Sequence, residues 1–114
     1  MTDDKLYLLH IIECISHVEQ YIAEGREHFF ADAKTQDAVL RNLQIMAEST
    51  QRLSPELRTT HPSVDWRGIA GFRNILVHDY LGVNPVRVWN IIENYLPDLK
   101  RAIAVMLEEL DEKP

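Results

Sequence analysis

Cysteine is nearly absent from this sequence, and long hydrophobic runs are absent altogether. Cys14 is the only cysteine among 114 residues, so no internal disulfide can form and a reducing compartment is favoured. A run of about 20 apolar residues, the length that spans a bilayer, does not occur. The acidic start of the chain does not look like a secretory signal. We therefore expect a cytoplasmic protein with no membrane contact.

Strand-like alternation is also missing, and only four glycines occur. Apolar residues recur instead at helical spacing, which predicts an all-α single domain over residues 1–114. The expected fold is an antiparallel up-and-down helical bundle of four to five helices. Ser54-Pro55 could add a short turn, and Pro97 either kinks the last helix or begins another. The expected helices cover residues 3–24, 32 or 35 to 53, 63 or 65 to 80, and 84 onward.

The net charge of −6 argues against loose affinity for nucleic acid. The charge is unevenly spread, however, because residues 41–101 carry more Lys and Arg than Asp and Glu while both flanking regions are acidic. Arginine suits forked contacts with phosphate. The middle of the chain could therefore hold an anion site, although ordinary solvated arginines would give the same pattern.

Two glycines lie three residues apart in the third expected helix. Gly68 and Gly71 each cost a helix up to about 1 kcal/mol against alanine. Their presence indicates that another helix approaches closely, either from the same chain or from a second copy. An ordinary internal helix crossing would explain them equally well.

Polar side chains follow these glycines in an otherwise apolar helix. His78 can exchange a proton near neutral pH, Arg73 can stabilise charge on a phosphate, and Asn74 can orient either the histidine or a substrate. This set suits RNA cleavage without a metal or other cofactor, in which the ribose 2′-hydroxyl attacks the neighbouring phosphate. Spacing alone would equally fit a structural arginine–histidine pair.

Helix geometry complicates this hypothesis. Arg73 and His78 are five residues apart, which places them about 140° apart around an ideal helix. Three arrangements could bring them together: the helix loosens before Gly82, the long arginine swings across, or two copies share one site. The third arrangement also supplies two histidines, one as base and one as acid.

The stretch from Trp66 to Tyr80 resembles the HepT-like branch of the HEPN superfamily. The signature of that family is Arg, four residues, His, one residue, Tyr, and Arg73, His78 and Tyr80 match it without a gap. The resemblance covers nearly the whole chain, because four further segments are also similar to the family: 35–43, 83–84, 88–89 and 95–99.

The resemblance implies an up-and-down helical bundle that forms a homodimer with a composite ribonuclease site. It further implies a toxin that a small nucleotidyltransferase antitoxin neutralises by transferring AMP to Tyr80. Arg73 and His78 would then be catalytic, with Asn74 as a helper and RNA rather than DNA as substrate. Arg67 and Arg87 are weaker candidates for substrate binding.

Two alternatives remain open at this point. The cleft that holds these residues could instead belong to a non-catalytic module that binds a nucleotide or a protein. The acidic net charge mildly favours this alternative. His10, Cys14 and His17 share one stripe of the first helix and could bind zinc. They lack a fourth ligand, so we expect a structural or interface role and no metal. Trp66 and Trp89 are expected in the core or at a dimer contact.

Overall fold

The computed structural model describes residues 3–78 and 83–112, and every regular element in this part of the chain is a helix. The all-α prediction is therefore confirmed. Six helices occur where four or five were expected, because two of them are short. The long helices are α1 (Asp4–Tyr21), α3 (Ala33–Gln51), α5 (Trp66–His78) and α6 (Pro85–Glu112), and the short ones are α2 (Arg26–Ala31) and α4 (Pro55–Thr59).

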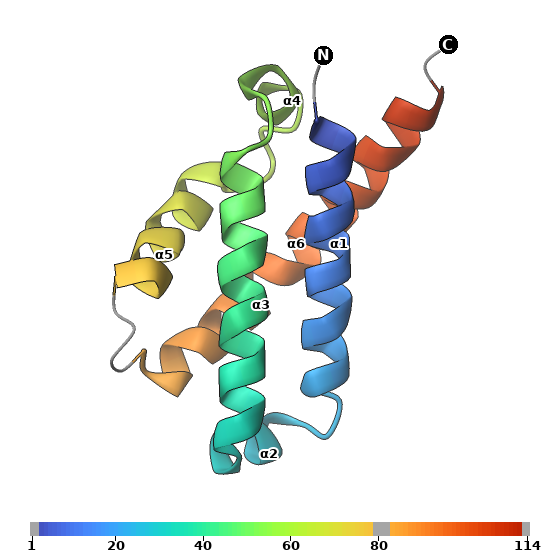
Figure 1. Cartoon of the computed structure of the whole chain (residues 1–114). Helices are drawn as coiled ribbons and strands as arrows, with labels where there is room; N and C mark the ends of the chain where they lie inside the picture. The colour runs from blue at the N-terminus through green and yellow to red at the C-terminus, as the bar shows by residue number, and fades with distance from the viewer. Residues whose placement is uncertain (1–2, 79–82, 113–114) are drawn as a thin grey trace.

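Helix α3 lies at the centre of the bundle. It packs against α1 on one side and α5 on the other, while α6 crosses behind and packs against α1 (Figure 1). Successive long helices run in opposite directions, as the up-and-down prediction requires. The short helices lie at opposite ends, α2 below α3 and α4 above it (Figure 1). None of the described helices is long and apolar enough to cross a membrane.

The predicted apolar stripes form the core. Leu8, Ile11 and Ile15 of α1 are fully buried or nearly so, as is Leu43 of α3, because residues three and four apart share one helix face. Trp89 is 8% exposed and its ring centroid lies 5.2 Å from that of Phe29. Trp89 is therefore a core residue, one of the two roles expected for it.

Trp66 has a different role from Trp89. Its ring is half-buried at the start of α5 and packs against the core. The indole Nε1 donates hydrogen bonds of 3.0 Å to the carbonyl oxygens of Arg58 and His61. Trp66 thereby ties the loop that follows α4 to the beginning of α5.

The helix ends depend on capping side chains and on one glycine. Ser54 caps α4 by accepting a hydrogen bond from the N–H of Leu57 at 3.2 Å, and Asn84 accepts one from Val86 at 2.9 Å at the start of α6. Helix α2 begins directly after Gly25, whose φ of +100° suits glycine. This helix was not predicted, because its six residues are too few to show a periodic pattern.

Pro97 lies inside α6, which continues past it as one helix. Proline cannot donate the backbone hydrogen bond of a helix interior. The neighbouring side chains of Leu96 and Leu99 are 5% and 0% exposed, however. Packing on both sides of the proline therefore holds the two halves of α6 together.

Candidate active site

Helix α5 separates a buried face from an exposed one. Ile69, Phe72 and Leu76 point into the core, whereas the opposite face exposes side chains at helical spacing. That exposed face contains Arg67, Gly71, Asn74 and His78. The predicted site residues Asn74 and His78 therefore share one solvent-facing surface.

Arg73 lies between these two faces and is held by an acid from α3. Its Nε and Nη2 atoms donate hydrogen bonds of 2.9 and 2.7 Å to one carboxylate oxygen of Glu48. Its Nη1 atom donates to Asn74 Oδ1 at 3.3 Å. The Arg73 side chain is 32% exposed, so the guanidinium is fixed in position yet still reachable from solvent.

The structure does not bring Arg73 and His78 together within one chain. Helix α5 stays regular through His78, so no loosening occurs up to that residue. Arg73 is turned toward Glu48, which opposes a swing toward the histidine. The described residues therefore show neither a loosened helix up to His78 nor an arginine turned toward it, which leaves the third arrangement, a site shared by two copies, as a proposal.

The other predicted site residues lie apart from this pair. Tyr80 falls outside the described residues. Arg67 is exposed about three helical turns before His78, a distance of about 16 Å along α5. Arg87 is exposed in the first turn of α6.

The two glycines of α5 have different surroundings. A methyl group on Gly68 would lie 2.6 Å from the Tyr95 hydroxyl and would also meet the Asp65 carboxylate. The carboxylate of Asp65 accepts a hydrogen bond of 2.9 Å from the N–H of Gly68. A methyl group on Gly71 would meet nothing within 4 Å. A side chain at Gly68 would therefore displace Asp65 and Tyr95, whereas the described residues leave open space around Gly71 on the exposed face.

Sequence reasoning missed Glu48. It lies 25 residues before Arg73 in the sequence. Its place on the polar side of α3 was the only sequence feature that could have indicated a role for it. Its second carboxylate oxygen lies 3.7 Å from the Nε atom of Arg52. Glu48 therefore links α5 to a second arginine, Arg52, which caps the C-terminal end of α3.

Two of the three residues considered as zinc ligands, His10, Cys14 and His17, have structural surroundings. The Nδ1 atom of His17 lies 3.0 Å from the Oδ1 atom of Asn42, and Cys14 is buried. Burial and, to a lesser extent, the nearby Glu13 carboxylate raise the pKa of the Cys14 thiol to about 11. Within residues 3–78 and 83–112, no group of three or more His, Cys, Asp or Glu side chains could hold a metal ion.

Comparison with known proteins gives a consistent result. The family model "Ribonuclease HepT-like" matches residues 11–106. A Thermococcus cleftensis protein named "Probable ribonuclease HepT" is 36% identical over 84% of the chain and 88% of its own length. A Caldanaerobacter subterraneus protein named "Putative RNase" is 34% identical over 96% of the chain and 98% of its own length.

A longer relative also matches. The chain is 36% identical, over 96% of its residues, to a Methanocaldococcus jannaschii protein named "Gamma-glutamylcyclotransferase and putative RNase". The chain spans half the length of that protein. No solved structure matches the chain significantly. On the family model and these relatives, the chain belongs to the HepT-like ribonuclease family.

Proposed function

We propose that this protein is a metal-independent RNA endonuclease whose active site is shared by two copies. The observation that carries the proposal is the fixed, half-exposed guanidinium of Arg73, which contacts Asn74 on the same helix that exposes His78 and carries the family signature. Membership of the HepT-like ribonuclease family supports it. We further propose that residues 1–114 act as a single HEPN-like domain in the cytoplasm.

The reaction uses only side-chain chemistry. His78 of one copy takes the proton of a ribose 2′-hydroxyl, and the oxygen attacks the adjacent phosphorus. The bond to the 5′-oxygen of the next nucleotide breaks, that oxygen takes a proton from the second His78, and a 2′,3′-cyclic phosphate remains. Arg73 stabilises the added negative charge on the phosphorane, and Asn74 orients the arginine through the contact at 3.3 Å.

We also propose that the protein is a toxin controlled by an antitoxin. A partner nucleotidyltransferase would transfer AMP to Tyr80, two residues after His78. A bulky anion there would block the site and compete for Arg73. The proposed control needs no change of fold, because the added group itself fills the site.

The test is RNA cleavage by the purified protein in excess chelator. Wild type is compared with His78→Ala and with His28→Ala, a matched control at a half-exposed histidine on α2. We expect cleavage with cyclic phosphate ends in wild type and the control, none in His78→Ala, and none for a substrate with 2′-deoxyribose at the cleaved position.

The protein mass separates the remaining outcomes. An inactive wild type that is heavier by one or more AMP units supports the antitoxin proposal. An inactive wild type of unmodified mass contradicts the nuclease proposal and favours the non-catalytic binding module. Cleavage that survives in His78→Ala would contradict the role of the histidine.

A further inference from the structure

A groove runs along the outer side of α3, next to the candidate active site. It has a volume of about 470 Å³ and is bordered by α1, α3 and the end of α5. Two residues that line the groove connect it to α5, because Glu48 binds Arg73 and Val77 directly precedes His78. The groove is therefore continuous with the helix that carries the proposed catalytic residues.

The charge of this groove is opposite to that of the whole protein. Two cations, Arg41 and Arg52, line it, and its one carboxylate, Glu48, already contacts Arg52 and Arg73. In four other hollows formed by the described residues, carboxylates equal or outnumber Lys and Arg side chains. A chain of net charge −6 thus presents cations beside its proposed active site, which attracts an anionic ligand.

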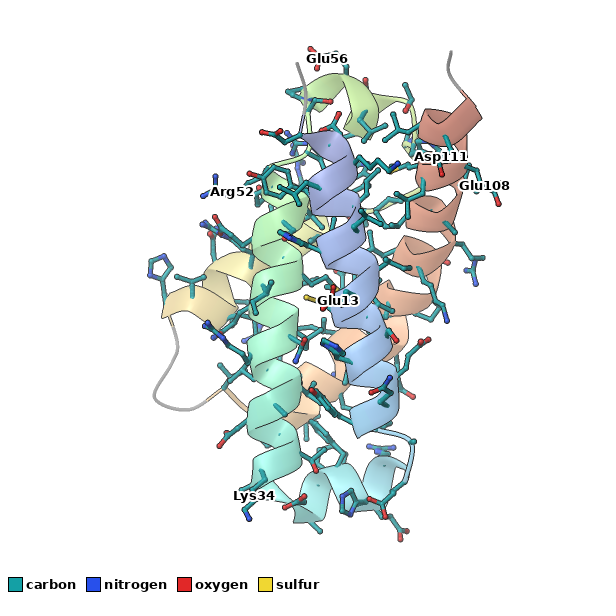
Figure 2. All side chains as sticks on the ribbon, turned by 45° about the vertical axis from the view of Figure 1, so that its right-hand side comes forward. Glu13, Lys34, Arg52, Glu56, Glu108 and Asp111 are labelled. Carbon is teal, nitrogen blue, oxygen red and sulfur yellow. The ribbon has the colours of Figure 1, made fainter. Side chains whose placement is uncertain are left out.

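The spacing and chemistry of the residues in the groove suit a ligand with several phosphates better than a single small anion. Arg41 lies on α3 and Arg52 caps its C-terminal end about three turns later, or about 16 Å along the helix, so they cannot bind the same phosphate. Arg52 projects outward from α3 (Figure 2). Between and beside the arginines lie the ring of Tyr7 and the side chain of Ile45, which is 38% exposed.

Cations that alternate with aromatic and aliphatic surface are typical of proteins that bind single-stranded nucleic acid. The phosphates contact the cations, and unpaired bases cover the apolar surface. A duplex keeps its bases stacked inside and cannot use that surface.

We propose that this groove binds the single-stranded RNA next to the cleaved bond, with Arg41 and Arg52 on phosphates and Tyr7 against a base. The inference rests on the proposed function, and it adds a substrate class: an unpaired RNA segment several nucleotides long. Neither Arg41 nor Arg52 takes part in the chemistry, so both determine affinity for the RNA rather than the rate of bond cleavage.

The first experiment measures binding without cleavage. The probe is a single-stranded RNA oligomer with 2′-O-methyl groups, which removes the attacking hydroxyl. Arg41→Gln/Arg52→Gln is compared with Lys100→Gln/Arg101→Gln, a control that removes the same charge from α6. In the control, Lys100 pairs with Glu19 at 2.8 Å and Arg101 pairs with Asp98, away from the groove.

We expect the groove variant to bind at least about tenfold more weakly than wild type. The slope of log affinity against log salt should fall by about 1.4, or about 0.7 for each lost phosphate contact to a single strand. The control variant should bind like wild type. A duplex RNA of the same sequence should compete poorly. Equal binding by the two variants would overturn the proposal, and so would a change of oligomeric state in the groove variant alone.

The second experiment separates this proposal from the nuclease proposal. A dinucleotide reaches only the cleaved bond, so Arg41→Gln, which leaves the contact between Arg52 and Glu48 in place, should cleave it at the wild-type rate while kcat/KM for a long RNA falls. Wild type that binds the 2′-O-methyl oligomer through the arginines but cleaves nothing would contradict the nuclease and support the groove. Cleavage of long RNA at the wild-type kcat/KM by the groove variant would overturn the groove alone.

Discussion

The carboxylate of Glu48 contacts two arginines, Arg73 and Arg52. Its contact with Arg73 fixes the position of this proposed catalytic residue. One carboxylate oxygen accepts two hydrogen bonds from Arg73, and the other lies near Arg52. A charge-assisted forked contact restricts the guanidinium more than a neutral one does. We regard Glu48 as a positioning residue, because it acts through Arg73 and not on the substrate.

Glu48→Gln keeps the shape of the side chain but removes its charge. Because hydrogen bonds to charged groups contribute about 1.5–3 kcal/mol, we expect kcat for RNA cleavage to fall about tenfold or more, with KM unchanged or lower. The measurement is kcat and KM determined separately, with Glu13→Gln on the exposed side of α1 as control. A rise in kcat would show that Glu48 restrains Arg73 instead of positioning it.

Cys14 illustrates how burial changes the chemistry of a single side chain. The pKa of its thiol is raised from 9.0 to about 11, first by burial and then by Glu13. At pH 8 the folded protein therefore holds about 100-fold less thiolate than the unfolded chain. We expect an aromatic disulfide reagent to react at least that much more slowly with native protein than with denatured protein. Rapid reaction of the native protein would contradict the burial of Cys14.

The raised pKa of the Cys14 thiol also makes the stability of the folded protein depend on pH. The folded state keeps the thiol protonated at a pH where the unfolded chain has already lost the proton. Unfolding therefore releases a proton between about pH 9 and pH 11. The contribution of Cys14 to stability is complete below pH 9 and is lost as the pH rises through 11. Cys14→Ser should show a smaller decrease of the unfolding midpoint over this range.

At the scale of helices, Asp4 joins the start of α1 to the start of α4. The side chain is 7% exposed, and its carboxylate accepts hydrogen bonds of 2.8 Å from the Ser54 N–H and 2.7 Å from the Ser54 hydroxyl. Asp4→Ala leaves these donors without a partner, so we expect a loss of about 1–3 kcal/mol in unfolding free energy.

Chemical denaturation measures this effect. The matched control is Asp3→Ala, one residue earlier. Asp3 is exposed and its side chain makes no capping hydrogen bond. The control should change stability by at most about 0.5 kcal/mol. If both variants lose the same amount, the contact between Asp4 and Ser54 does not stabilise the bundle.

At the scale of the whole molecule, the separation of Arg73 and His78 makes the shared site testable. Arg73→Ala and His78→Ala should each be inactive alone. Because the proposed cleavage uses His78 of both copies, a mixed dimer of wild type and His78→Ala has no complete site. An equimolar mixture of these two proteins that exchanges subunits should then keep about a quarter of the activity of wild type at the same total concentration. About half of that activity, with exchange demonstrated by mass, would show that each copy cleaves with its own histidine.

Local sequence determined the helices and their buried faces. Helical periodicity is a property of neighbouring residues, so the stripe of Leu8, Ile11 and Ile15 could be read without a structure. Arg73 and His78 stood out as polar side chains in an otherwise apolar segment, and the resemblance to the family signature assigned their roles, which stay predictions. Local patterns were less informative for α2, which is too short to be periodic, and for Pro97, whose effect depends on packing around α6.

Only the tertiary structure decided which distant groups meet. Glu48 reaches Arg73 across 25 residues, and Asp4 reaches Ser54 across 50. The arginines of α3 form a groove only because α1 and α5 pack on either side of that helix. Such contacts depend on the register between packed helices, which no local periodicity specifies. The sequence by itself therefore determined the elements and the chemical groups, while helix packing determined which groups act together.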